Sequence, residues 1–421
     1  MSGISHELSA AAAVRPHRFS WRTRIFAVTW LAYAGFYLCR KNFSVLMPFL
    51  QNQARISKLR LADILFYYSL CYSAGQFLMG SLADRFSPRT VVGVGLVVSA
   101  AANFAMAGHT AYAVLLALGM VNGLAQSAGW PGLIKIMAAW FRPEERGVVM
   151  GWWTTNYVFG GVAATLFAAW SVGRRHWTNG FILPAALLLA VAVVFVTLVR
   201  DRPSDASAEA GPIVRRNPLA NYREVMSQPV VWSTAAAACL VKITRYSFLF
   251  WLPLYLTERL GYRPEQAGYL SSIYEFAGIG GALAAGYASE KLLGSRRYPV
   301  VSIMLAGLAL ACLIQPRLGG LGWAGTLAGI ALIGVMTYGP DTILQGAACQ
   351  DAGGARGAAS AAGVVNGVAS LGQLASPYLV ALVATRWGWD TLFGVFVAIA
   401  LAGSAAAAPF WNYRAADTRI P

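Results

Sequence analysis

Long apolar runs separated by short polar segments make up most of the chain. Most of these runs hold about 20 residues or more, the length at which a helix rising 1.5 Å per residue crosses the hydrocarbon of a bilayer. The pattern predicts an all-α membrane protein with twelve spans. We place these spans at 25–50, 62–82, 90–108, 111–140, 147–171, 178–199, 230–257, 266–288, 298–315, 320–345, 358–385 and 389–411.

One long polar segment, from Arg200 to Ser227, divides the spans into six plus six. An even number of spans puts both termini on one side. Most Lys and Arg residues outside the spans fall on that side, which the positive-inside rule assigns to the cytoplasm. Residues 1–24 lack the hydrophobic core of a signal peptide. We therefore expect a cytosolic tail at 1–24, a six-helix bundle at 25–199, a cytoplasmic linker at 200–229, a second six-helix bundle at 230–411 and a C-terminal tail at 412–421.

The composition agrees with a membrane protein and argues against nucleic-acid binding, a metal site and enzymatic activity. Hydrophobic residues make up 57% of the chain and charged residues 12%, about half the share typical of soluble proteins. The net charge of +16 does not require a nucleic-acid partner, because the basic residues are scattered through short loops. Five Cys without paired spacing and four dispersed His predict no disulfide, metal site or cofactor. Motifs for a catalytic nucleophile or a phosphate-binding glycine loop are also missing, so we do not expect an enzyme.

Two adjacent cations, Arg40 and Lys41, lie inside the first apolar run. A charge at this depth costs a few kcal/mol and normally faces a protein interior or a water-filled cavity. Tyr33, Tyr37 and Ser44 recur at helical spacing with these cations, which predicts a common face. The alternative is that the cations end a shorter helix and reach the headgroups. The apolar run that continues after them favours the cavity interpretation.

Three further basic residues lie within the predicted spans, two of them in the second half of the chain. Arg245 is in span seven, the counterpart of span one, so Arg40 and Arg245 could face each other across a central cavity. The forked donors of Arg match the oxygens of a phosphoryl group. Lys242, one turn before Arg245, is either a third cavity cation or a side chain that reaches one interface. Lys135 in span four is expected to be a structural cation.

Two acids accompany these cations. Glu275 is expected to pair with Lys41 or Arg40, because an unpaired buried carboxylate is costly. Asp341 carries a proton or caps a broken helix, and the preceding Pro340 favours capping. The cations outnumber the acids, so the cavity should attract anions and repel cations. This argues against a cationic-drug exporter.

The two halves repeat a polar motif after their second spans. Gly80 begins the first copy and Gly286 the second, 206 residues later. Such an offset indicates a parallel internal repeat. The motif could be a solvated cytoplasmic turn, but its recurrence favours a latch at a cytoplasmic gate. The acidic and basic gate candidates are Asp84, Arg85, Arg89, Glu290 and Lys291.

Six short motifs occur in order along the chain. They are Tyr37 to Phe43, Gly129-Trp130-Pro131 through Trp140, Glu144 to Gly147, Thr244 to Tyr246, Tyr274 to Ile279, and Tyr338-Gly339-Pro340. With these motifs the sequence resembles the major facilitator superfamily and, within it, the organophosphate:phosphate antiporter family.

The resemblance implies a major facilitator fold, with 12 transmembrane helices in two pseudo-symmetric six-helix bundles. It also implies that Arg40 and Arg245 hold a phosphoryl group. The other candidate substrate-binding residues are Tyr33, Tyr37, Lys41, Tyr157, Lys242 and Tyr274.

The chain departs from the best-known members of that family at three positions. Tyr157 stands where they have a histidine, so a titratable contact becomes a neutral hydroxyl. Gln76 replaces a lysine of the glycerol-3-phosphate transporters, and Phe250 replaces an acid that follows the arginine of span seven. These changes keep the arginine pair and alter its surroundings.

We therefore expect a monomeric transporter in the inner (cytoplasmic) membrane. It would move a small phosphorylated or phosphonate-like organic anion in exchange for inorganic phosphate. A proton-coupled carboxylate symporter, with Asp341 or Glu275 as the proton site, is an alternative. A transporter-like receptor for sugar phosphate is another.

Overall fold

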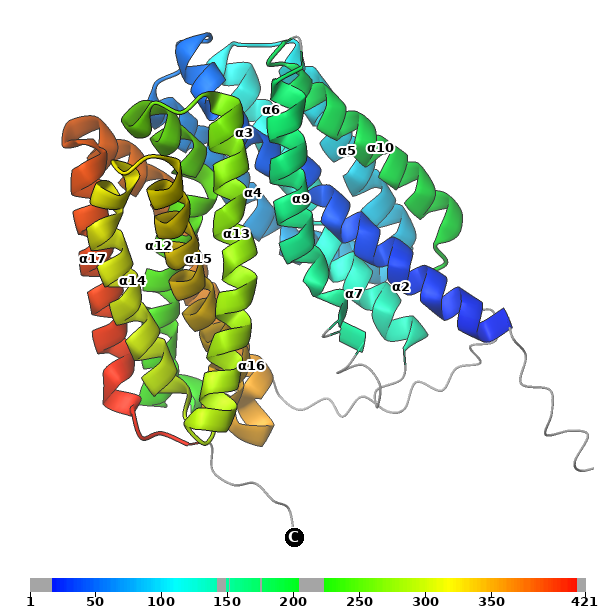
Figure 1. Ribbon diagram of the computed structural model, residues 1–421. Coiled ribbons are helices and arrows are strands. Elements are labelled where there is room, and N and C mark those ends of the chain that lie inside the picture. Colours follow the sequence, from blue (N-terminus) through cyan, green and yellow to red (C-terminus); the bar gives the residue numbers. More distant parts are fainter. Residues whose placement is uncertain (1–16, 142–148, 151, 175, 204–222, 415–421) are drawn as a thin grey trace, which may run out of the picture.

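The computed structural model describes residues 17–141, 149–150, 152–174, 176–203 and 223–414, and every element with printed bounds in these ranges is helical. Figure 1 shows the long helices packed along roughly one direction. The first half of the chain holds α2 (His17–Phe36), α3 (Leu38–Asn52), α4 (Lys58–Arg85), α5 (Pro88–Ala107), α6 (Tyr112–Gln126), α7 (Gly129–Trp140), α9 (Thr155–Val172) and α10 (Asn179–Leu198). The second half holds α12 (Pro229–Leu260), α13 (Pro264–Tyr287), η1 (Ala288–Leu292), α14 (Arg297–Gly319), α15 (Trp323–Ile343), η2 (Leu344–Ala348), α16 (Cys349–Arg386), α17 (Gly388–Ala407) and η3 (Ala408–Phe410).

Within the described residues, the predicted spans coincide with helices, but three connections differ from the prediction. The first span is two helices that meet at Tyr37, and the fourth is two helices that meet at Ser127 and Ala128. Between spans ten and eleven the expected loop is absent, since η2 and α16 follow α15 directly. By length and composition alone, eight described helical segments are apolar enough to cross a membrane. α2, α3, α4, α9 and α13 are not among these eight.

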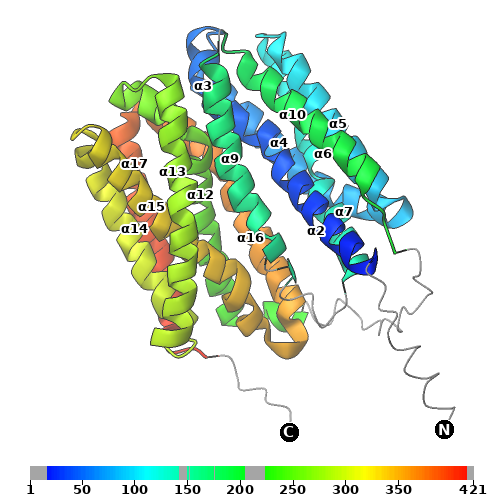
Figure 2. The ribbon, with the colours of Figure 1, turned by 45° about the vertical axis from the view of Figure 1, so that its right-hand side comes forward.

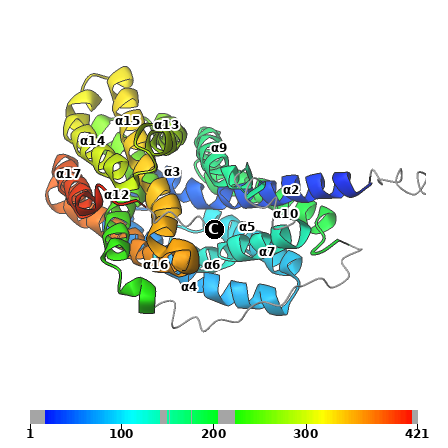
Figure 3. The same ribbon diagram turned by 90° about the horizontal axis from the view of Figure 1, so that it is seen from below.

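The two halves form separate helix bundles that lie side by side, as Figures 2 and 3 show. α3 of the first half contacts α12 and α13 of the second, α9 contacts α13, and α4 contacts α16. These helices line the boundary between the halves.

A close helix contact recurs in the two halves around two tyrosines that have the same offset as the polar motif. A Cβ atom added at Gly123 of α6 would lie 2.3 Å from the carbonyl oxygen of Tyr68 in α4. A Cβ atom added at Gly334 of α15 would lie 2.3 Å from the carbonyl oxygen of Tyr274 in α13. Tyr68 and Tyr274 are again 206 residues apart. Each glycine lets two backbones approach closely, as small residues do in membrane bundles.

Side-chain bonds join the halves near one end of the molecule, where α3 ends and α4 begins. Glu258 of α12 accepts a hydrogen bond from Gln51 at 2.5 Å and pairs with Lys58 at 2.7 Å. Tyr378 of α16 donates to Asp63 of α4 at 2.8 Å. We call this end the Glu258 end. The opposite end, where α10 ends and α12 begins, is the linker end. The other side-chain contacts described between the halves, such as the pair of Lys41 with Glu275, lie in the middle of the molecule.

The gate motifs lie at the linker end and bind helices within their own half. Arg89 donates its backbone N–H to Asp201 at 2.8 Å and its guanidinium to the carbonyl of Val196. In the second half, Arg297 pairs with Asp351 at 3.0 Å and with Glu290 at 3.6 Å. Arg85 and Lys291 are exposed and Gly80 is half-buried, whereas the side chain of Asp84 lies outside the described part of the structure.

Candidate anion-binding cavity

A cavity of about 750 Å³ lies between the two halves. Its lining comes from helices of both halves. On α4 the lining residues are Tyr68, Tyr72, Ser73 and Gln76, so the cavity lies near the middle of that helix. Eight of the predicted residues line it: Tyr33, Tyr37, Arg40, Tyr157, Lys242, Arg245, Glu275 and Asp341.

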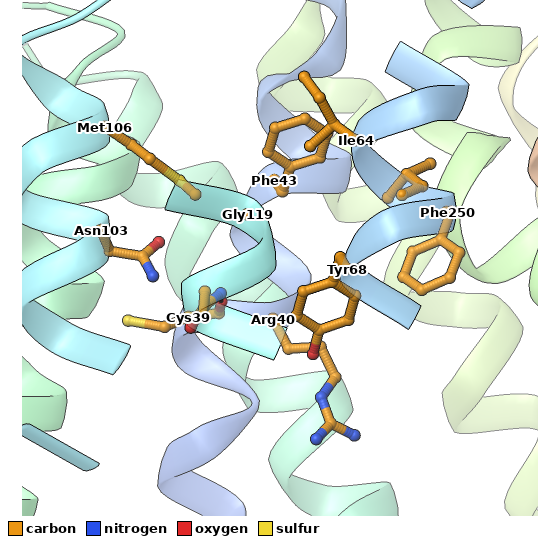
Figure 4. Close-up of a pocket in the computed structure, with 11 residues that line it drawn as sticks. Cys39, Arg40, Phe43, Ile64, Tyr68, Asn103, Met106, Gly119 and Phe250 are labelled. Carbon is orange, nitrogen blue, oxygen red and sulfur yellow. Dashed lines mark hydrogen bonds between the residues drawn. The ribbon is translucent and has the colours of Figure 1, made fainter. Parts of the chain in front are cut away.

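Arg40 enters this cavity from the first turn of α3, just after the break at Tyr37. Its Nε donates to Gln126 Oε1 at 2.8 Å, and its guanidinium lies 4.7 Å from the ring centroids of both Tyr37 and Tyr72. Figure 4 shows the guanidinium extending past Tyr68 and away from Met106. Within the described ranges, Arg40 has no carboxylate partner. Its surroundings are therefore polar and aromatic but neutral.

A buried network of neutral groups holds Gln126 in place. Tyr68 donates its hydroxyl to Gln126 Oε1 at 2.9 Å. Gln126 Nε2 lies 3.2 Å from Asn122 Oδ1, and Asn122 in turn donates to the carbonyl of Cys39 at 2.8 Å. A void of about 20 Å³ beside these groups (Figure 4) is large enough for a single water molecule. The sequence analysis did not predict this network. The pattern that could have indicated it is an asparagine and a glutamine one helical turn apart in an apolar run, Asn122 and Gln126.

Arg245 has a different environment, because it forms an ion pair with Asp341. Gln345 donates to the other carboxylate oxygen of Asp341 at 2.5 Å. The Arg245 guanidinium also lies 4.5 Å from the centroid of the Tyr338 ring. The capping hypothesis for Asp341 is wrong. The helix continues through Pro340, so Asp341 lies inside α15 and its carboxylate faces α12 and not a free helix end.

Lys41 turns away from the cavity, although it follows Arg40 directly. Its Nζ pairs with Glu275 at 3.1 Å and donates to the carbonyl of Leu249 at 3.1 Å. Both side chains are about 4% exposed. Ser44 likewise donates to the carbonyl of Phe250 at 2.5 Å. The face predicted for this stretch is thus divided: Arg40 faces the cavity, whereas Lys41 and Ser44 join α3 to the second half.

The remaining predicted residues take three positions. Lys242 lines the cavity with its Nζ 5.4 Å from the centroid of the Tyr246 ring. Tyr274 is buried behind Arg245 and donates to its carbonyl at 3.4 Å. Lys135 donates to the carbonyl of Ala83 at 2.7 Å, which joins α7 to α4. Tyr157, Gln76 and Phe250, the three departures, all line the cavity.

The described ranges contain no group of three or more His, Cys, Asp or Glu residues that could hold a metal ion. All five cysteines are free. The motif at 144–147 lies outside the described residues. The chemistry of the cavity is therefore that of its arginines, lysine, carboxylates, amides and aromatic hydroxyls.

Comparison with known families identifies the chain. The model of the Major Facilitator Superfamily matches residues 29–377. This chain is a member of the major facilitator superfamily. A glycerol-3-phosphate transporter of Bacillus subtilis (strain 168) is 31% identical over 418 residues, which cover 93% of this chain and 92% of the relative. Within the superfamily, the chain belongs to the organophosphate:phosphate antiporter family.

The chain is also similar in sequence to two other transport-related proteins and in structure to a solved transporter. A probable hexose phosphate transport protein of Chlamydia pneumoniae is 26% identical, with 95% of this chain and 93% of the relative covered. The membrane sensor protein UhpC of Escherichia coli (strain K12) is 27% identical, with 93% and 92% covered. Among solved structures, a bacterial homologue of the human lysosomal transporter Spinster superposes with a TM-score of 0.73 at 14% identity, covering 94% of this chain and 95% of that one. That likeness supports the major facilitator fold alone.

Proposed function

We propose that this protein is a secondary active transporter that exchanges a small phosphorylated or phosphonate-like organic anion for inorganic phosphate. The observation that carries this proposal is the central cavity with Arg40 and Arg245 contributed by opposite halves. Relatives that align over nearly the whole chain are a glycerol-3-phosphate transporter and a probable hexose phosphate transport protein. Guanidinium groups bind phosphoryl oxygens through paired charge-assisted hydrogen bonds.

Exchange follows from the charge of an empty cavity. Without a bound anion, Arg40 lacks a compensating carboxylate, and moving this charge between two exposures of the cavity carries a desolvation cost. A bound phosphate or organophosphate lowers that cost. The loaded transporter therefore reorients more easily than the empty one, and an inward step with one anion is followed by an outward step with another.

The protein is a multi-pass membrane protein, and we propose that it lies in the cytoplasmic membrane with both termini and the linker end facing the cytoplasm. The bundles would comprise residues 25–199 and 230–411, joined by a cytoplasmic linker at 200–229. The tails would be 1–24, whose last residues from His17 onward form the start of α2, and 412–421. The described side-chain bonds between the halves lie at the Glu258 end or in the middle of the molecule. The cavity of this conformation would thus open to the cytoplasm.

Two other functions have a specific observation in their favour. Asp341 and Glu275 both line the cavity, so a proton could accompany the anion in a symport. The relative UhpC is named a membrane sensor protein, which favours a sugar-phosphate receptor that binds without net flux. Collapse of the pH gradient would stop the symporter and leave an exchanger unaffected.

The deciding experiment is uptake of labelled inorganic phosphate into proteoliposomes with and without internal phosphate. We expect uptake that depends on internal phosphate and falls by at least tenfold in Arg40→Ala and in Arg245→Ala. Organophosphates added outside should compete with the label. An intact protein that exchanges no phosphate would contradict phosphate as the counter-ion.

A further inference from the structure

The two cavity arginines differ in how far a neighbouring carboxylate compensates their positive charge. The charged side chains lining the cavity are Arg40, Lys242 and Arg245 against Glu275 and Asp341. Asp341 is paired with Arg245, and Glu275 with Lys41. Among the described residues, Arg40 and Lys242 are therefore left without a carboxylate partner.

Lys242 is unusual for a lysine, because it is only 7% exposed. Within the described part of the chain, its ammonium makes no hydrogen bond or ion pair, and it lies 5.4 Å from the centroid of the Tyr246 ring. A buried ammonium without a partner is costly unless it faces water or a bound anion. Its position in the cavity lining places that charge where an anion enters.

The charge of the ligand matches these two cations. A phosphate monoester carries about −1.5 to −2 charges at pH 7, close to the two positive charges of Arg40 and Lys242. A contact with Arg245 would first require its separation from Asp341, whose other oxygen is held by Gln345. The anion meets no such competitor at Arg40 or Lys242.

We propose that Arg40 and Lys242 make the first contact with the phosphoryl group, and that Asp341 withholds Arg245 until the bound anion competes for its guanidinium. This inference rests on the proposed function and assigns an order to the cations of the same cavity. Asp341 acts as an internal substitute for the anion. Lys242 then sets the affinity, whereas Arg245 contributes during turnover.

The test is calorimetric titration of the full-length protein in lipid nanodiscs with inorganic phosphate at pH 8. We expect Lys242→Gln to weaken phosphate binding by tenfold or more. Asp341→Asn should strengthen binding by at least threefold, because it releases Arg245. Combining Lys242→Gln with Asp341→Asn should recover most of the lost affinity.

The paired substitution Arg245→Gln with Asp341→Asn removes the ion pair without leaving a lone charge. Under the proposal it weakens phosphate binding less than Lys242→Gln does, although it abolishes exchange. A greater loss from the paired substitution, or unaltered binding in Lys242→Gln, would overturn the proposal. Arg259→Gln, at an exposed ion pair with Asp390, is the control for removal of a positive charge, and thermal unfolding shows that each variant folds.

Failure of the two proposals gives different results. An intact protein that neither binds nor exchanges phosphate overturns the proposed function and this inference together. An intact protein that binds and exchanges phosphate equally well without Lys242 overturns the inference alone.

Discussion

At the scale of single residues, the site depends on which partner each cation has. Arg40 is held by a neutral amide and by aromatic rings, so its positive charge stays available. Arg245 is held by a carboxylate, so its charge is largely compensated. Similar guanidinium groups in corresponding spans thus have different electrostatic roles.

The neutrality of Gln126 is itself open to test. Gln126→Glu keeps the shape of the side chain but places a carboxylate 2.8 Å from Arg40 Nε in the present geometry. We expect phosphate affinity to fall by more than tenfold, because the new carboxylate compensates Arg40 and repels the anion. Gln126→Met is the matched control, since it removes the hydrogen bonds without adding charge. It should cost about 1–3 kcal/mol of stability and less affinity than Gln126→Glu, and equal losses of affinity would contradict the argument.

The sequence predicts charged site residues more readily than neutral ones. Arg40, Lys242, Arg245, Glu275 and Asp341 stand out because a charge in an apolar span needs a reason. Gln126, Tyr72 and Gln345 do not stand out, since neutral polar side chains are common in such spans. The sequence favours a capping role for Asp341 because Pro340, the residue before it, is a local signal. The ion-pair partner of Asp341 is Arg245, which lies 96 residues away in the chain and leaves no local signal.

At the scale of helices, hydrophobic patterning locates the spans but not their internal breaks. The break at Tyr37 is flanked by Phe36 and Leu38, and the nearby Gly35 lies within α2 and does not itself end that helix. The η2 segment likewise follows Ile343 without a polar loop. Such breaks depend on contacts with neighbouring helices, and the pattern of one segment does not contain them.

The repeated glycine contacts predict a specific loss of stability. Gly123→Ala and Gly334→Ala would each place a Cβ 2.3 Å from a backbone carbonyl oxygen of the adjacent helix. Overpacking of this kind typically costs about 1–3 kcal/mol, so both variants should unfold at lower temperature than the parent protein. Gly280→Ala is the control, because nothing lies within 4 Å of its added Cβ. Equal unfolding temperatures in all three variants would show that the helices can move apart without cost.

At the scale of the whole molecule, the described side-chain bonds between the halves lie at the Glu258 end and in the middle of the molecule. The bonds of Glu258 with Gln51 and Lys58, and of Asp63 with Tyr378, close the Glu258 end. Exchange by alternating access requires these bonds to break in each cycle. The Lys41 and Glu275 pair lies deeper between the halves and is buried, so it too must rearrange if the halves rotate apart.

A covalent link across the Glu258 end should therefore separate binding from exchange. In Lys58→Cys with Glu258→Cys, a short bifunctional thiol reagent would replace the ion pair that now spans 2.7 Å. We expect the linked protein to bind phosphate through the linker end and to lose exchange by tenfold or more, with recovery after a cleavable link is reduced. The single variants treated with the same reagent control for the five native cysteines. A linked protein that exchanges at the unlinked rate would show that the Glu258 end does not need to open, which is incompatible with a cycle in which the cavity is exposed alternately at each end.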